Sequence, residues 1–171
     1  MTPVPFPNSY WVFPRVFLAG EHPAAAGEHL TRKRLQALLQ AGVTAFVDLT
    51  EISSGRYDRI LFDEAEGYEL EVAYKNFPIR DFTAPAAIEV IAILDYLDLV
   101  ISQHQMVYLH CWGGIGRTGT IVGCYLTRHG LDGKASLDRI AELRRTLPPP
   151  YVRSPEADDQ VERVRYWPIG Q

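Results

Sequence analysis

The stretch His-Cys-Trp-Gly-Gly-Ile-Gly-Arg-Thr-Gly occupies residues 110–119. The apolar, β-favouring residues 106–109 before it predict a buried strand. Residues 120–129 after it predict a helix, and Gly130 is placed to end that helix. A strand, a glycine-rich turn and a helix in this order bind anions, because the backbone N–H groups of the turn point inward and the helix dipole adds to their field. The sequence therefore predicts an anion-binding turn.

Four side chains of this stretch give the turn a predicted chemistry. Cys111 lies at the mouth of the turn, where a helix N-terminus favours the thiolate form. Arg117 follows six residues later, and its planar guanidinium can hold two oxygens of one phosphate group. The pair predicts attack of sulfur on phosphorus and a cysteinyl-phosphate intermediate. We expect Thr118 to offer its hydroxyl to the sulfur and His110 to hold the turn by hydrogen bonds.

The spacing of His-Cys, five residues and Arg-Thr resembles the signature loop of the protein tyrosine phosphatase superfamily. The version in this chain is most similar to the compact dual-specificity group, and within it to the loop of the cyclin-dependent-kinase-associated phosphatase. The implied phosphate-binding residues are Trp112, Gly113, Gly114, Ile115, Gly116 and Arg117. The resemblance implies no metal ion and no other cofactor. Two alternatives are a buried cysteine in a glycine-rich turn with an arginine nearby by chance, and a relative that binds phosphate without turnover.

Length and charge limit the remaining possibilities. Residues 1–171 are enough for one domain with its own core, and we expect a single phosphatase domain with an extended N-terminal lead over residues 1–10. Apolar runs are too short to span a membrane. The net charge of −4 argues against nucleic acid or an anionic membrane as a partner. Two cysteines, Cys111 and a core residue Cys124, suit a reducing compartment, so we expect a cytoplasmic protein.

Hydrophobic periodicity predicts strands that alternate with helices, followed by helices alone. The predicted strands cover residues 11–13, 16–18, 43–49, 71–79 and 106–109. The predicted helices cover residues 31–41, 56–66, 85–103, 120–129, 134–147 and 155–167. Thr31 and Ser154 are expected to cap their helices. The pattern predicts an α/β domain with a central, mostly parallel sheet flanked by helices, and the resemblance implies the cysteine phosphatase fold.

A second catalytic group must protonate the leaving oxygen, and a carboxylic acid is the usual source of that proton. Our candidate is Asp81, because it follows a predicted strand and should reach the same sheet edge as Cys111. Its spacing of 30 residues before Cys111 is also similar to that of the general acid in compact dual-specificity enzymes. The alternative is that Asp81 caps a turn or pairs with Arg80. Asp48 and Asp63 are the other candidates.

Two later segments carry weaker signals. Gln160 follows Ser154-Pro155-Glu156 in a run that resembles the segment where some relatives place a water-positioning glutamine, although a glutamine in a predicted helix is more often exposed. Arg144 and Arg145 could attract phosphate, but their place on a helix favours solvated side chains.

The variable positions of the turn bear on the substrate. Phosphatases of inositol phosphates in this superfamily often carry lysines there, whereas this chain has Trp112 and Ile115. One phosphate on a protein fits better, and Trp112 is expected to wall the entrance. We therefore predict hydrolysis of phosphotyrosine, and of phosphoserine and phosphothreonine, on a phosphorylated protein partner. The alternatives are an inositol-phosphate or small-molecule phosphatase and a phosphate-binding adaptor. The oligomeric state is left open.

Overall fold

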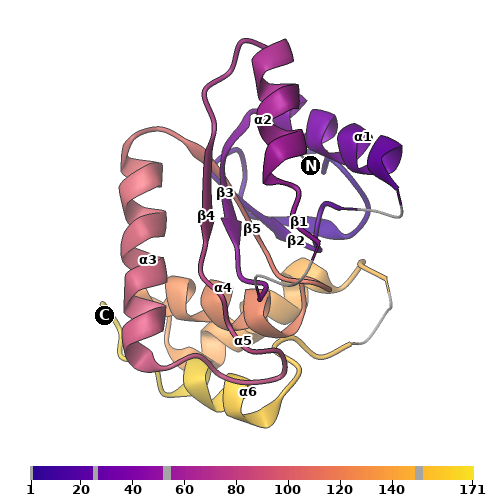
Figure 1. Cartoon of the computed structure of the whole chain (residues 1–171). Helices are drawn as coiled ribbons and strands as arrows, with labels where there is room; N and C mark the ends of the chain where they lie inside the picture. The colour runs from indigo at the N-terminus through magenta and orange to yellow at the C-terminus, as the bar shows by residue number, and fades with distance from the viewer. Residues whose placement is uncertain (1, 25–26, 52–54, 149–151) are drawn as a thin grey trace.

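A five-stranded sheet forms the centre of the computed structural model, which describes residues 2–24, 27–51, 55–148 and 152–171 (Figure 1). The strands are β1 (Ser9–Phe13), β2 (Phe17–Gly20), β3 (Val43–Asp48), β4 (Ala73–Asn76) and β5 (Met106–His110). Their spatial order is β1-β2-β5-β3-β4, and only the pairing of β1 with β2 is antiparallel. The prediction of a mostly parallel central sheet is confirmed.

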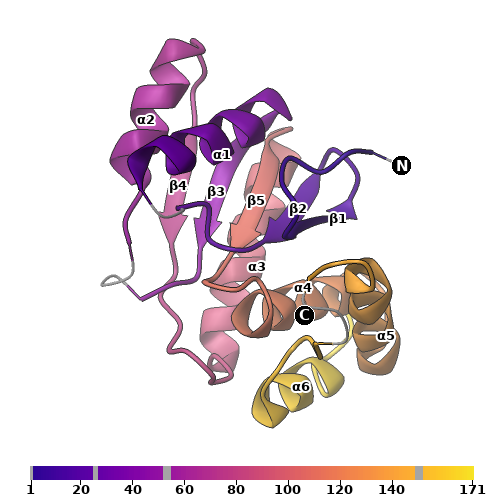
Figure 2. The same ribbon diagram turned by 90° about the vertical axis from the view of Figure 1, so that its right-hand side faces the viewer.

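Helices cover both faces of this sheet. They are α1 (Glu28–Gln40), α2 (Asp58–Gly67), α3 (Ala87–Ser102), α4 (Gly116–Arg128), α5 (Gly133–Arg144) and α6 (Asp158–Arg165). Figure 2 shows α1 and α2 over one face and α3 to α6 over the other. This is the predicted α/β architecture, with the helices that accumulate at the end of the chain packed together on one side.

The two faces of the sheet bury different halves of each strand, because successive strand residues point to opposite faces. Leu18, Phe46 and Tyr108 are fully buried in the cluster beneath α1 and α2. Phe17 and Val107 are fully buried in the cluster beneath α3 to α6. This explains why the predicted strands read as near-continuous apolar runs, as expected where helices cover both faces.

Helix starts differ from the predictions by three residues or more at three places, and by one or two residues at the others. α1 begins three residues before Thr31, whose hydroxyl donates to the Gly27 carbonyl instead of capping the helix. α6 begins at Asp158, and Ser154 donates its hydroxyl to the Ile115 carbonyl of the turn. α4 begins at Gly116 and so includes Arg117. Glycines at a helix start weaken the sequence signal, which is why the periodic pattern begins only at residue 120.

The structure also differs from the predicted strand over residues 71–79 and from the extended N-terminal lead. The predicted strand 71–79 is a strand only over β4. Within the lead, Phe6 is 7% exposed and its ring meets Tyr108 edge-on, while the Trp11 indole donates to the Pro3 carbonyl, so residues 3–6 lie against the domain. Among the described residues, no helix is both long and apolar enough to cross a membrane.

Candidate active site

The carboxyl ends of three parallel strands bring together residues that are far apart in the chain. Gly20 at the end of β2 and Asp48 at the end of β3 both pair in register with His110, the last residue of β5. The turn of residues 111–115 leaves this edge and α4 follows it at once. Ligands of parallel sheets bind at this edge. The predicted order of strand, turn and helix is therefore present at the expected place.

The turn has one position that requires glycine. Gly114 has a φ of 67°, in the left-handed region that disfavours other residues. A Cβ there would overlap the carbonyl group of Gly20 and the amide nitrogen of Glu21. A Cβ at Gly113, in contrast, would meet only the Ile115 side chain, at 3.5 Å. The turn thus packs backbone to backbone against the end of β2.

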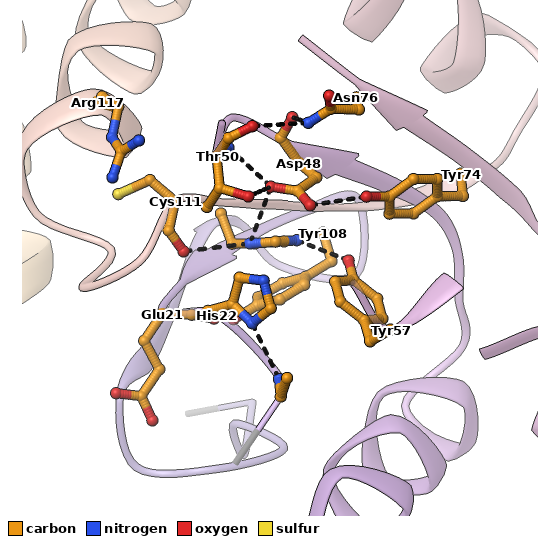
Figure 3. A network of polar contacts seen from close by, with 12 residues as sticks. Glu21, His22, Asp48, Thr50, Tyr57, Tyr74, Asn76, Tyr108, Cys111 and Arg117 are labelled. Carbon is orange, nitrogen blue, oxygen red and sulfur yellow. Dashed lines mark hydrogen bonds and ion pairs between the residues drawn. The ribbon is translucent and has the colours of Figure 1, made fainter. Parts of the chain in front are cut away.

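The predicted pair Cys111 and Arg117 is buried on the α4 side of the turn. The two residues are 3% and 4% exposed, and Figure 3 shows the Cys111 sulfur pointing toward the Arg117 guanidinium. That guanidinium donates to the Ile79 carbonyl at 3.0 Å and pairs with an Asp81 carboxylate oxygen at 3.0 Å. Arg117 is therefore held inward instead of pointing to solvent.

Asp81 lies next to the turn, as the shared sheet edge predicts. Its side chain is 46% exposed and pairs with Arg117, not with Arg80. It also accepts from the backbone N–H of Phe82, whose φ is 56°, so the capping alternative describes part of its role. The Asp81 carboxylate thus reaches solvent beside the buried Arg117 guanidinium.

The other two candidate carboxylates lie elsewhere. Asp48 is 2% exposed and accepts hydrogen bonds from Thr50 and Tyr74. Asp63 is on α2, which covers the opposite face of the sheet from α4, and it is 3.6 Å from Arg32. Asp81 is thus the one of the three that contacts Arg117.

Hydrogen-bonded side chains support the turn from the sheet; we call Asp48, Thr50, Tyr57, Tyr74 and His110 the sheet-side network (Figure 3). His110 is fully buried, and its Nδ1 lies 3.2 Å from the Cys111 carbonyl. A carbonyl can only accept, so Nδ1 carries the proton and Nε2 accepts from the Tyr57 hydroxyl at 2.6 Å. Burial lowers the pKa of His110 below its ordinary value, which keeps this ring neutral.

Asp48 is the acceptor at the centre of the network. One of its oxygens accepts from the Thr50 amide at 2.8 Å and the Thr50 hydroxyl at 2.7 Å, and the other accepts from the Tyr74 hydroxyl at 2.7 Å. Its first oxygen is also 3.9 Å from His110 Nδ1. Three donors and a nearby imidazole N–H offset the cost of burying this carboxylate.

His22, Asp48 and His110 offer possible metal-ligand atoms within 4.8 Å of one another. The hydrogen bonds argue against such a ligand set. His22 Nδ1 accepts from the Ala24 amide at 3.1 Å, which puts the proton of the neutral ring on Nε2, and His110 Nδ1 already donates to the Cys111 carbonyl. Metal-bound imidazole needs a free lone pair, so the trio fits a hydrogen-bonded cluster better than a metal site.

Side chains from the end of the chain support the turn from the other side; we call Arg144, Ser154, Glu156 and Gln160 the helix-side contacts. Arg144 donates to the Gly114 carbonyl at 2.6 Å, and Ser154 donates to the Ile115 carbonyl at 2.7 Å. The expectation of a solvated Arg144 is therefore wrong, because the end of α5 faces the turn. Arg145, one residue on, is exposed.

Gln160 is fully buried, so the expectation that it is exposed is also wrong. Its side chain accepts from the Ala157 amide and donates to the Thr83 carbonyl, both at 3.2 Å, which joins α6 to the loop that carries Asp81. A Cβ at Gly116 would lie 2.9 Å from Gln160 Oε1 and 2.5 Å from Glu156 Oε1. α6 approaches this closely because Gly116 has no side chain.

Glu156 is the residue of the site that sequence reasoning missed. The pKa of its carboxyl is raised above the ordinary value, first by burial and then by the nearby Asp81. Arg117, Arg144 and the Gly116 amide act in the opposite direction but do not outweigh these causes. A carboxylate in this position faces groups that also suit a phosphate. Only the position of Glu156 in the run before Gln160 could have indicated it.

The remaining predicted residues lie as follows. Thr118 is fully buried, and its hydroxyl has no hydrogen-bond partner among the described residues, the Cys111 sulfur included. Trp112 is 57% exposed and its ring lies 5.1 Å from that of His22. Cys124 is fully buried, burial raises its pKa to about 12, and both cysteines are free thiols.

Glycines on α4 allow a close approach by the segment that follows α5. A Cβ at Gly119 would overlap the Ser154 hydroxyl and lie 3.2 Å from the Pro155 nitrogen. A Cβ at Gly123 would lie 2.6 Å from the Val164 side chain. The helix that begins at the turn is therefore packed tightly against the segment that supplies the helix-side contacts.

Known proteins share both the sequence and the fold of this chain. Over 109 residues it is 32% identical to a putative tyrosine phosphatase, 067L, of Invertebrate iridescent virus 3, and over 126 residues it is 31% identical to the mouse dual specificity protein phosphatase CDC14B. These matches cover 60% and 70% of this chain but 42% and 24% of the relatives, so the chain spans less than half the length of either. The crystal structure of Tk-PTP in the active form superposes with a TM-score of 0.71 at 25% identity, over 94% of this chain and 95% of that one.

The family comparison covers the turn and the strands β3, β4 and β5. The family described as "Tc-R-P: Polymorphic toxin system, DSP-PTPase phosphatase" matches residues 24–131, a segment that includes Asp81, Cys111 and Arg117. The chain belongs to this DSP-PTPase phosphatase family, within the dual-specificity group of the protein tyrosine phosphatase superfamily.

Proposed function

We propose that this chain is a cysteine-dependent protein phosphatase that hydrolyses phosphotyrosine, and also phosphoserine and phosphothreonine, through a cysteinyl-phosphate intermediate. The observation that carries the proposal is the inward-facing Arg117 guanidinium beside the Cys111 turn, held by the Ile79 carbonyl and Asp81. The other thiol, Cys124, is fully buried, and burial raises its pKa. The thiol chemistry suits a reducing compartment such as the cytosol.

In the first step, the Cys111 thiolate attacks phosphorus and the P–O bond to the substrate breaks. Arg117 and the backbone N–H groups of residues 112–116 hold the three non-bridging oxygens. Asp81, as the acid, gives its proton to the leaving oxygen. The products of this step are the free hydroxyl of the substrate and the cysteinyl phosphate.

In the second step, water attacks phosphorus and the P–S bond breaks. Asp81, now a carboxylate, takes a proton from the water, which restores its acid form and releases phosphate. Thr118 donates a hydrogen bond to the departing sulfur, and its unpartnered buried hydroxyl supports this role. Gln160 is a candidate to position the water, which its burial next to Gly116 supports.

The test compares Cys111→Ser and Asp81→Ala with wild type on a phosphotyrosine peptide and on aryl phosphates. Cys111→Ser should bind the peptide and release no phosphate. Asp81→Ala should lower kcat by roughly 10²–10⁴, least for substrates with good leaving groups. Asp63→Ala, another exposed aspartate, is the matched control and should behave as wild type.

Three outcomes would overturn the proposal or replace its substrate class. Full turnover by Cys111→Ser contradicts the covalent mechanism. Faster release of phosphate from inositol phosphates than from phosphopeptides selects the small-molecule alternative. Tight binding of phosphopeptide by freshly reduced wild-type protein, without release of phosphate, selects the adaptor. Reduction is needed because a reactive thiolate oxidises readily.

A further inference from the structure

A cavity lies between α5, α6 and residues 152–154. Its volume is about 580 Å³. Its charged wall consists of Lys134, Asp138, Arg144, Arg145, Arg153 and Arg165. Five cations against one carboxylate are an unusual concentration in a chain whose net charge is −4. We call this cavity the basic cleft.

Two of these five cations have no carboxylate partner within the described residues. Lys134 pairs with Asp138 and Arg153 pairs with Asp158, each within 2.7 Å. The side chains of Arg145 and Arg165 form no ion pair or hydrogen bond within the described parts of the chain. Arg144 donates from one terminal nitrogen to the Gly114 carbonyl, while its buried Nε has no partner among the described residues. Three guanidinium groups around one cavity repel each other, and a bound anion would relieve that repulsion.

The chemistry of the wall selects the ligand class. Guanidinium groups present paired N–H donors that match the oxygens of phosphate-type anions. A carboxylate has two oxygens and can bind one guanidinium through both of them. A phosphate-type group has three or four oxygens and can bind several arginines at once. The apolar part of the wall, such as Leu137 and Val161, leaves room for the carbon skeleton of an ester.

Two residues of the helix-side contacts also line the basic cleft. Arg144 and Ser154 both line it, and they donate to the carbonyls of Gly114 and Ile115. A ligand that attracts the Arg144 guanidinium acts on the same group that holds the Gly114 carbonyl. A ligand bound in the cleft would therefore affect the turn through the Arg144 side chain.

We propose that the basic cleft is a second oxyanion site, separate from the Cys111 turn, which binds a phosphate-type group and is coupled to the turn through Arg144. The group is either a free phosphate compound or a second phosphate on the bound substrate. This inference goes beyond the proposed function, and the binding test below does not depend on turnover.

The binding test is an NMR titration of the Cys111→Ser protein with inorganic pyrophosphate, following backbone amides of the cleft, at Ala141 and Val161, and amides of the turn. The double variant Arg145→Ala/Arg165→Ala should weaken binding at the cleft roughly tenfold or more, because charge-assisted hydrogen bonds are lost, and should leave binding at the turn unchanged. Arg139→Ala is the matched control, since Arg139 lies on α5, pairs with Glu142 and does not line the cleft. Thermal unfolding checks that each variant is folded. Equal affinity at the cleft in all three proteins, or no shifts there at all, overturns the proposal.

The kinetic test distinguishes the two sources of the group. If the ligand is free, pyrophosphate changes the wild-type kcat at saturating aryl phosphate, and the double variant does not respond. If the substrate carries it, wild type has a higher kcat/KM for a doubly phosphorylated peptide than for the singly phosphorylated one, and the double variant loses that preference. Binding at the cleft with neither effect would refute the coupling through Arg144.

Discussion

The two sides of the Cys111 turn are supported by different chemistry. On the sheet side, His110, Tyr57 and Asp48 are at most 2% exposed, and both histidine nitrogens and both carboxylate oxygens have hydrogen-bond partners. On the helix side, Arg144 is only partly buried and Glu156 has charged neighbours. The sheet side therefore resembles a core, whereas the helix side combines the buried Ser154 and Gln160 with two partly buried charged residues, Arg144 and Glu156.

The difference has a structural origin. Apart from Tyr57, the sheet-side network lies on or next to β3, β4 and β5, whose register holds Asp48, Asn76 and His110 side by side. The helix-side contacts depend on the packing of α4, α5 and α6, which meet at glycines. We expect substitutions on the sheet side to lower the free energy of unfolding most, and those on the helix side to act mainly on binding and turnover.

The largest expected effect is that of Asp48→Ala. The change leaves the Thr50 amide, the Thr50 hydroxyl and the Tyr74 hydroxyl without their acceptor in the interior, and we expect a loss of about 4 kcal/mol in the free energy of unfolding. Urea denaturation measures it, with Asp63→Ala as the exposed control, which should change stability by no more than about 0.5 kcal/mol. A loss of under about 1 kcal/mol for Asp48→Ala would show that the sheet side is not core-like.

A pH effect should come next, and it arises from His22. Burial and the neighbouring His110 lower its pKa from 6.5 to about 4, so the unfolded chain binds more protons than the folded one between these values. Stability should therefore fall as the pH decreases from 6.5 to 4, with His22 contributing about 2–3 kcal/mol of the loss.

The measurement compares urea unfolding of wild type and His22→Gln at pH 7 and pH 4.5. The glutamine does not titrate, so the variant should lose less stability than wild type over this interval. Equal losses in the two proteins would place the acid sensitivity in other groups.

Gly114→Ala tests the turn between its two supports. A positive φ and the overlap of the new Cβ with the Gly20 carbonyl group should lower the free energy of unfolding by about 2 kcal/mol and distort the carbonyls that Arg144 and Ser154 bind. Gly113→Ala is the matched control, because its Cβ meets only a side chain at an ordinary distance. Equal stability of the two alanine variants would contradict the backbone contact.

The smallest effects compare one hydrogen bond from each side. Tyr57→Phe leaves His110 Nε2 unpaired in the core, and Ser154→Ala leaves the Ile115 carbonyl without its side-chain donor. Each should lower the free energy of unfolding by about 1 kcal/mol, Tyr57→Phe by the larger amount because its partner is fully buried. Ser154→Ala should in turn change kcat more than Tyr57→Phe does. If Ser154→Ala lowered stability more than Tyr57→Phe, and Tyr57→Phe changed kcat more than Ser154→Ala, the difference between the two sides of the turn would be contradicted.

Sequence reasoning was accurate where the chemistry is local. The strand before the turn, the turn itself and the helix after it lie within one continuous segment, so their residue types and spacing carry the information. The position of Asp81 near the turn was predicted from topology, because strand ends of a parallel sheet share one edge, and the ion pair with Arg117 lies there. The predicted helix starts were less accurate at α4, where glycines weaken the pattern, and at α1, which begins before the predicted cap Thr31.

The amino-acid sequence by itself determined an α/β domain with a glycine-rich turn between a strand and a helix that carries Cys111 and Arg117, because periodicity, glycine spacing and side-chain type act over short distances along the chain. Only the tertiary structure decided that Arg144 holds the turn, that Gln160 is buried and that Glu156 faces Gly116. Those positions depend on how α5 and α6 pack against α4, and the periodicity of a single helix shows that one face is buried without showing which atoms of another segment cover it.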